Sequence, residues 1–407
     1  MTLLLLPSRL PEEPASNCNN IQPNCPYVGS FFYLYLSLTF IYSMKIKDIL
    51  GILETMAPLA YAEDFDNVGL LTGNVNDSIK GILVCHDAHE EVIDEAITKG
   101  CNLIVCFHPI LFSGLKKITG KNYVERAVIK AIKNDIAIYA VHTALDNHKQ
   151  GVNKIFCDAL GLTDTKILIP KDNFIRKLVT YTTPENYEDL RRALFAAGAG
   201  SIGNYSNCSF NSTGTGTYKG NENSSPQVGN RGEFVQANEI KIEVTFEKHL
   251  EANILKALFA NHIYEEVAYE IYSLNNTHQN IGLGMTGKLP QPMNEKDFLQ
   301  FVKQKMDAHG IRHSAYIGRP VSKVAVLGGS GSFAIKAAIA AGADVFLTAD
   351  LKYHQFYEAE GKLLLADIGH YESERYTQNY IAKYLGTHTQ GISINITEVD
   401  TNPVKYL

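Results

Sequence analysis

The sequence predicts an α/β protein with two α/β lobes and a small α+β domain inserted into the chain. Three observations support this. Short apolar runs alternate with amphipathic helical segments over residues 79–162. The pattern changes between residues 171 and 280, and alternation resumes over 281–407. Continuous apolar strands separated by helices are typical of parallel sheets covered on both faces, so each alternating stretch predicts one α/β lobe.

The first lobe is predicted over residues 44–170. The apolar runs at 79–87, 102–107 and 136–142 are predicted strands, and 89–100, 122–134 and 151–162 are predicted helices. In such a sheet, ligands bind beyond the carboxyl ends of the strands. The residues that follow each predicted strand are therefore the first ones to inspect for function.

The middle segment, residues 171–280, predicts a ferredoxin-like α+β domain. Its predicted strands and helices alternate in the order β-α-β-α-β, at 174–183, 185–200, 239–247, 249–262 and 265–274. Residues 201–234 are rich in Gly, Asn and Ser and poor in large aliphatic side chains, so they are predicted as a long loop. Because the alternating pattern resumes afterwards, this domain is predicted to be an insertion.

The second lobe is predicted over residues 281–407. Its predicted helices lie at 296–308, 333–342 and 371–385, and its predicted strands at 323–332, 344–350, 363–370 and 391–399. The first of these strands ends in the Gly-rich stretch GGSGS at 328–332. This stretch fits the GxGxxA pattern of a dinucleotide site, an anion-binding nest at a helix start, or merely a tight turn. Only three more predicted strands follow, which argues against a complete dinucleotide-binding sheet.

Residues 1–43 do not share the pattern of the rest. An apolar run at 28–43 is about sixteen residues long, whereas a spanning helix needs roughly 20. Met44 begins a segment that reads like a natural protein start. We interpret residues 1–43 as an extension that does not belong to the folded domains and that results from a start codon assigned too early. A membrane anchor is the alternative.

The composition of the chain bears on which partners it binds and on the cellular compartment in which it works. The formal net charge is −6, with 37 Lys and Arg against 43 Asp and Glu, so there is no basic footprint for nucleic acid. The seven Cys are scattered and form no CxxC pair, which indicates neither a disulfide framework nor a zinc ribbon. We therefore expect a cytoplasmic protein without nucleic-acid or membrane partners.

Several predicted strands end in imidazole or carboxylate side chains. These are His108 after 102–107, His142 and Asp146 at and after the end of 136–142, and His370 with Glu374 after 363–370. A single His is usually structural, but several on one rim of a sheet indicate a shared site. Imidazole and carboxylate together suit zinc, iron or manganese, so the rim predicts a metal site.

Five motifs, in this order, also carry a resemblance. They are AEDFDNVGLLTG (62–73), CFHPILFSG (106–114), HTALDN (142–147), LTADLKYHQ (347–355) and DIGHYESE (367–374). Over about 44–407 the chain resembles the GTP cyclohydrolase I type 2 homologue family, the Ngg-interacting-factor-three-like proteins. Residues 171–280 resemble the PII-like domain inserted in the longer bacterial members.

The resemblance implies two divalent metals in a cleft between the lobes, and a homohexamer. The implied metal ligands are a His-His pair, an Asp, and a His and Glu four apart; they fall on His108, Asp146, His370 and Glu374. The first His of the pair falls on Phe107, which cannot bind a metal. We therefore expect one strong metal site and a weakened second one, unless Phe107 is simply a wall residue. His142 and His354 are candidate substitutes and candidate proton-transfer groups.

Two functions follow from the resemblance and the rim. The first is a metal-dependent hydrolase of a nucleotide, which opens the guanine ring of GTP and releases formate. The second is a metal-binding scaffold or regulatory module without turnover, in which the PII-like insert senses a small ligand or arranges the oligomer.

Overall fold

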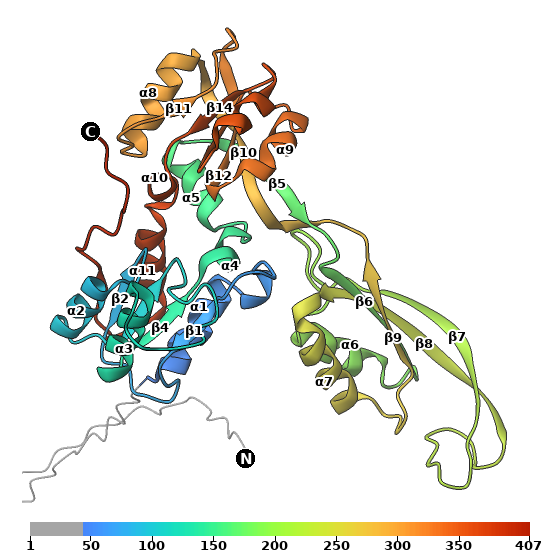
Figure 1. The fold of residues 1–407 in the computed structure, drawn as a ribbon. Helices are drawn as coiled ribbons and strands as arrows, with labels where there is room; N and C mark the ends of the chain where they lie inside the picture. The colour runs from blue at the N-terminus through green and yellow to red at the C-terminus, as the bar shows by residue number, and fades with distance from the viewer. Residues whose placement is uncertain (1–43) are drawn as a thin grey trace, which may run out of the picture. The chain divides into compact units, whose positions relative to one another are not determined.

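The computed structural model describes residues 44–407 and contains three β-sheets with helices packed against them (Figure 1). The expectation for residues 1–43 lies outside the described residues. No helix within 44–407 is both long enough and apolar enough to cross a bilayer.

The first lobe is built on a five-stranded sheet in the order β1-β4-β3-β2-β15. Four of its strands are parallel and β1 is antiparallel at one edge. Every residue of β2, β3 and β4 is buried, because α1 and α11 cover one face and α2 and α3 cover the other. The strands are β1 (Gly69–Thr72), β2 (Ile82–Cys85), β3 (Leu103–Cys106), β4 (Ala137–Ala140) and β15 (Ile394–Ile396). The helices are α1 (Ile46–Met56), α2 (Glu90–Thr98), α3 (Tyr123–Lys133) and α11 (Thr377–His388), with η1 (Leu59–Tyr61) and α4 (His142–Asp146) at the rim.

The second lobe is built on a six-stranded sheet in the order β11-β14-β13-β12-β10-β5. Its central strands β12, β13 and β14 are parallel, and the others are antiparallel to their neighbours. The strands are β5 (Thr163–Lys171), β10 (His278–Met293), β11 (Arg312–His313), β12 (Val321–Ser330), β13 (Val345–Ala349) and β14 (Leu364–Asp367). The helices are α5 (Val152–Ala159), α8 (Glu295–Lys305), η3 (Ser332–Ala334), α9 (Ile335–Ala340), η4 (Tyr353–Ala359) and α10 (His370–Glu374).

The insert is a four-stranded antiparallel sheet in the order β7-β8-β6-β9, with two helices against one face. Its chain order is β-α-β-β-α-β, and this strand order is that of a ferredoxin-like fold. The elements are β6 (Ile175–Thr182), α6 (Tyr187–Ala196), β7 (Phe210–Lys219), β8 (Phe234–Glu247), η2 (Lys248–Leu250), α7 (Glu251–Asn261) and β9 (Tyr269–Leu274). The predicted loop 201–234 is therefore wrong in part, since β7 lies inside it.

The sheets divide the chain somewhat differently from the predicted ranges 44–170, 171–280 and 281–407. Strand β5 lies in the first range but pairs with β10 in the second lobe. Helix α11 and strand β15 lie in the last range but pack in the first lobe. The single helix predicted at 371–385 is divided into α10 and α11, because α10 contacts β12 of the second lobe and α11 contacts β2 and β15 of the first.

Candidate metal centre

Three imidazoles converge on one carboxylate oxygen where the two lobes meet. The Oε2 atom of Glu374 lies 3.2 Å from His86 Nε2, 3.4 Å from His108 Nε2 and 3.3 Å from His370 Nε2. The Nε2 atoms of His108 and His370 are 3.3 Å apart. Glu374 and His86 are buried, whereas the side chains of His108 and His370 are 22% and 37% exposed, so the cluster is closed on one side and open on the other.

These spacings match the coordination sphere of a small divalent ion. Metal–nitrogen and metal–oxygen bonds of about 2.0–2.1 Å at tetrahedral angles place neighbouring ligand atoms about 3.3–3.4 Å apart. The atoms of His86, His108 and Glu374 meet the proximity expected for a shared ion. The Oε2 atom of Glu374 and both ring nitrogens of His86 are buried without a hydrogen-bond partner among residues 44–407. Buried polar atoms are rarely left unpaired, and a bound ion would satisfy them.

Each lobe orients one imidazole with a carboxylate from the next strand. His108 follows β3, and its Nδ1 lies 2.9 Å from Oδ1 of Asp87, which follows β2. His370 begins α10 after β14, and its Nδ1 lies 2.7 Å from Oδ2 of Asp350, which follows β13. A carboxylate on Nδ1 fixes the ring and leaves Nε2 for a metal, which is the usual arrangement around metal-binding His.

These carboxylates also shift the ionisation of the imidazoles. Burial lowers the pKa of His108, but its hydrogen bond with Asp87 and the negative charge of the adjacent Glu374 outweigh burial and raise the pKa to about 9. Burial likewise lowers the pKa of His370, but Glu374 and Asp350 raise it to about 11. Burial raises the pKa of Glu374, whereas the adjacent imidazoles, His370 first, hold it well below its usual range. The centre therefore combines an ionised carboxylate with imidazoles stabilised in the charged form, and a cation would replace their protons.

The Gly-rich stretch 328–332 makes room for Glu374. A Cβ atom on Gly329 would lie 2.5 Å from Glu374 Oε1, and the φ of Gly329 is 69°, in the left-handed region. The N–H of Gly328 donates to Asn153 Oδ1, and the N–H of Gly329 donates to Ser373 Oγ. Because side chains of the protein already occupy these amides, the stretch acts as a tight turn that admits the carboxylate.

Asp146 lies at the end of α4, and its Oδ1 atom is enclosed without a hydrogen-bond partner among the described residues. Burial, and then the negative charge of Glu374, raise the pKa of Asp146 well above its usual value. His108 and His370 oppose this shift, which shows that Asp146 feels the charges of the same centre. An enclosed carboxylate beside a second one is the environment that a divalent cation stabilises.

Comparison with known proteins agrees with the resemblance seen in the motifs. The family model Duf34/NIF3 (NGG1p interacting factor 3) matches residues 44–403. The chain belongs to the DUF34/NIF3 family. It is 39% identical over 371 residues to a Bacillus subtilis protein named GTP cyclohydrolase 1 type 2 homolog, covering 90% of this chain and 99% of that one. A Staphylococcus epidermidis protein of the same name is 34% identical over 370 residues, covering 89% and 100%.

Solved structures of DUF34/NIF3 relatives share the fold. The crystal structure of a Bacillus cereus protein related to NIF3 has a TM-score of 0.77 at 36% identity, covering 90% of this chain and 100% of that one. The Staphylococcus aureus protein SA1388 has a TM-score of 0.71 at 27% identity, covering 89% and 99%. These likenesses extend over both lobes and the insert.

His86 is the residue of this candidate centre that the sequence analysis does not select. It ends the predicted strand 79–87, directly before Asp87, so it meets the same criterion that selected His108 and His370. The resemblance places the corresponding ligand at position 107, on the neighbouring strand. The structure buries both side chains, and their rings stack with centroids 5.3 Å apart.

The two predicted substitutes for the missing ligand have different surroundings. His142 begins α4 and its ring lies 5.2 Å from that of His108, but Asp66 Oδ1 is 2.8 Å from its Nδ1. His354 is exposed in η4 and contacts the rings of Tyr353 and Tyr357. His142 therefore borders the centre, while the contacts of His354 are on η4 itself.

A cavity of about 540 Å³ opens beside the imidazoles and provides space for a small molecule. Its walls come from the rims of both lobes and from the C-terminal segment. The lining includes His86, Asp87, His108, Arg312, Asp350, Asp367, His370, Tyr371, Glu372, Asn402 and Tyr406. The arrangement can thus present a bound ion to a substrate in the same cavity.

Proposed function

We propose that this protein is a divalent-metal-dependent hydrolase that acts on a nucleotide. The observation that carries the proposal is the convergence of three imidazole nitrogens on Glu374 Oε2, with His108 and His370 oriented by carboxylates. The printed name of the Bacillus subtilis relative, GTP cyclohydrolase 1 type 2 homolog, suggests the substrate class. The corresponding reaction opens the guanine ring of GTP and releases formate.

The residues that would hold the metal are His86, His108, Asp146, His370 and Glu374, and the ion is zinc, iron or manganese by ligand type. When bound, such an ion polarises a substrate oxygen and acidifies water. Asp87 orients the ring of His108, and Asp350 orients the ring of His370. In both rings this leaves Nε2 as the atom that would bind the metal. The buried position of Glu374 excludes water from its side of the centre and strengthens each electrostatic contact there.

We propose His142 as the proton-transfer residue, and its surroundings support this role. Its Nδ1 is held by Asp66, whose other oxygen accepts hydrogen bonds from the backbone N–H and the hydroxyl of Thr143. This leaves Nε2 as the nitrogen for proton exchange, in a ring oriented by a carboxylate. His142 also has a backbone φ of 20°, which L residues rarely adopt. Such backbone conformations often accompany functional positions.

The test combines metal analysis with a turnover assay. We expect the purified protein to contain zinc, iron or manganese and to release formate from GTP. The substitution His142→Gln should preserve metal content and lower turnover by about 100-fold or more, in line with loss of general acid–base catalysis. His354→Gln is the matched control and should change neither. Absence of metal from the native protein would refute the centre itself, whereas metal without turnover on any nucleotide would leave only the scaffold function.

The assembly and compartment are further parts of the proposal. We propose a cytoplasmic homohexamer, as the family resemblance implies, with a small-molecule substrate and no nucleic-acid or membrane partner. Light scattering coupled to size-exclusion chromatography would give the mass, and a monomer at micromolar concentration would contradict it.

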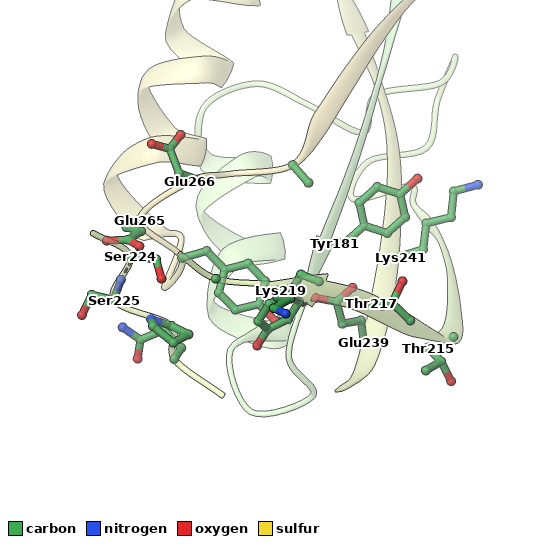
Figure 2. Close-up of a pocket in the computed structure, with 18 of the residues that line it drawn as sticks. Tyr181, Thr215, Thr217, Lys219, Ser224, Ser225, Glu239, Lys241, Glu265 and Glu266 are labelled. Carbon is green, nitrogen blue, oxygen red and sulfur yellow. Dashed lines mark hydrogen bonds between the residues drawn. The ribbon is translucent and has the colours of Figure 1, made fainter. Parts of the chain in front are cut away.

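A second function, ligand sensing by the insert, is favoured by a separate pocket. A cavity of about 710 Å³ lies against β7 and β8 (Figure 2). Its floor includes Gly214 and Gly216, and Glu239 accepts a hydrogen bond of 2.8 Å from Tyr264. The charged and aromatic groups of the lining are Tyr181, Tyr218, Lys219, Glu239, Lys241, Tyr264, Glu265 and Glu266. Three carboxylates and three phenol rings suit a ligand with a planar body and amine donors.

This pocket has its own test. A Cβ atom on Gly214 would meet nothing within 4 Å, so Gly214→Val should fill part of the pocket without disturbing the strand. Thermal-shift measurements with nucleosides and aromatic amines should show stabilisation that is lost in Gly214→Val but kept in Glu374→Ala. Stabilisation that instead disappears in Glu374→Ala would assign the ligand to the metal centre.

A further inference from the structure

Position 107 and position 86 are neighbours across two parallel strands. Cys85 of β2 pairs with Cys106 of β3, so the next residue on each strand, His86 and Phe107, follows at the same rim. The N–H of Phe107 donates to the carbonyl of Cys85, and the N–H of His108 donates to the carbonyl of His86. Adjacent strands are about 4.8 Å apart, so an imidazole at 86 starts only one strand away from one at 107.

The side chain of Phe107 is packed in the hydrophobic core of the first lobe. It is fully buried and belongs to the hydrophobic cluster of the first lobe, together with Val105, Tyr139 and Leu145. Its ring stacks on that of His86 at an interplanar angle of 27°. Phe107 therefore supports the position of His86 from the core side.

His86 has the properties of a ligand without its ion. Its side chain is only 2% exposed, and neither Nδ1 nor Nε2 has a hydrogen-bond partner among residues 44–407. The Nε2 atom lies 3.2 Å from Glu374 Oε2, which is itself unpartnered. Two buried polar atoms at this distance, without hydrogen-bond geometry, point to a positive group bound by both.

We propose that His86 supplies the metal-binding imidazole that position 107 lacks, so that the ligand has moved from β3 to the neighbouring strand β2. This inference rests on the proposed metal centre. It adds a third imidazole to those of His108 and His370 around Glu374. The chain then holds two ions, in contrast to the single strong site expected from the sequence.

The experiment exchanges the two rings. Four proteins are compared: the unmutated chain, His86→Phe, Phe107→His, and the double exchange of both. Zinc and manganese equivalents are counted by mass spectrometry after dialysis, and affinities are measured with a competing chelator. Because the rings stack on each other, the exchange nearly conserves packed volume, and circular dichroism reports whether each variant folds.

The expected result is two ions in the unmutated chain and one in His86→Phe, with at least about 100-fold weaker binding of the second ion. The double exchange should recover two ions, and Phe107→His alone should keep two. Loss of the second ion in His86→Phe and its recovery in the double exchange support the relocation. One ion in the unmutated chain, or two in folded His86→Phe, would overturn it. Absence of all metal from the unmutated chain would instead refute the proposed function.

Discussion

The two lobes hold their imidazoles in the same way but differ in what else they contribute. In the first lobe Asp87 orients His108 from the adjacent strand end, and in the second Asp350 orients His370. The first lobe adds a buried imidazole, His86, whereas the second adds the carboxylate Glu374. Each lobe therefore supplies one imidazole oriented by a carboxylate from the adjacent strand end. The candidate metal centre needs the residues of both lobes.

The largest effect should come from the carboxylate that both halves share. Glu374→Ala removes the oxygen around which all three imidazoles gather, so we expect both ions to bind at least about 100-fold more weakly. Chelator competition measures the loss. Glu372→Ala is the matched control, since Glu372 lies on the same helix but contacts Asn402. Unchanged affinity in Glu374→Ala would show that the lobes meet without forming a metal centre.

The next test asks whether the two halves are equivalent. Asp87→Asn and Asp350→Asn each remove the charge that orients one imidazole while keeping side-chain size. We expect each to weaken metal affinity by about 10–100-fold, measured by the same competition titration. A clear loss in one variant and none in the other would break the equivalence of the lobes.

A smaller effect is expected at the turn that accommodates Glu374. In Gly329→Ala the new Cβ would approach Glu374 Oε1 to 2.5 Å, so the carboxylate must shift and affinity should fall by about 10-fold. Gly342→Ala is a close control, because its φ of 68° is similar to that of Gly329 but no atom lies within 4 Å of its added Cβ. Both should lose about 1 kcal/mol of folding stability. Equal affinities in the two variants would mean that Glu374 does not depend on this turn.

The smallest effect on the centre should come from removing the insert. Residues 173–276 can be replaced by Asn-Gly, because Lys171 on β5 pairs with His278 on β10 and a two-residue turn suits such a pair. All proposed ligands lie outside this range, so metal content should be unchanged. Tyr61 loses its contacts with Phe174 and Glu247, and a modest fall in melting temperature is expected. Loss of metal from the folded deletion protein would show that the insert supports the lobes.

The sequence was informative where a signal is local. Continuous apolar runs predicted β2, β3, β4, β13 and β14, and residues placed after strand ends led to His108, His370 and Glu374. In contrast, β10 contains three Gly and two Pro within IGLGMTG and KLPQP, and it is a strand because β5 and β12 pair with it on both sides. Similarly, β7 is rich in Thr and Gly and depends on pairing with β8. Long-range pairing leaves little trace in a local pattern.

In the candidate site, too, local features could be predicted from the sequence and long-range contacts could not. A His four residues before a Glu is visible in sequence, but the approach of His86 to Glu374 joins residues 288 positions apart, which only the folded chain reveals. The resemblance also pointed to position 107, and the side chain that approaches Glu374 is one strand away. Thus residue types at strand ends were predictable, while which strand brings its side chain to Glu374 is visible only in the folded chain.

The pairing of β5 with β10 has a consequence for how the chain folds. These strands lead into and out of the insert, and His278 faces Lys171 where they separate. An insert that folds early brings its own two ends together and replaces a long, flexible loop by a short closed one. The entropy lost on closing a loop rises with its length, so the second lobe forms its β5–β10 pair at lower entropic cost. An insert that folds first would speed assembly of the lobe, and in stopped-flow refolding we expect an insert unfolded by substitution to slow the lobe more than deletion of the insert does.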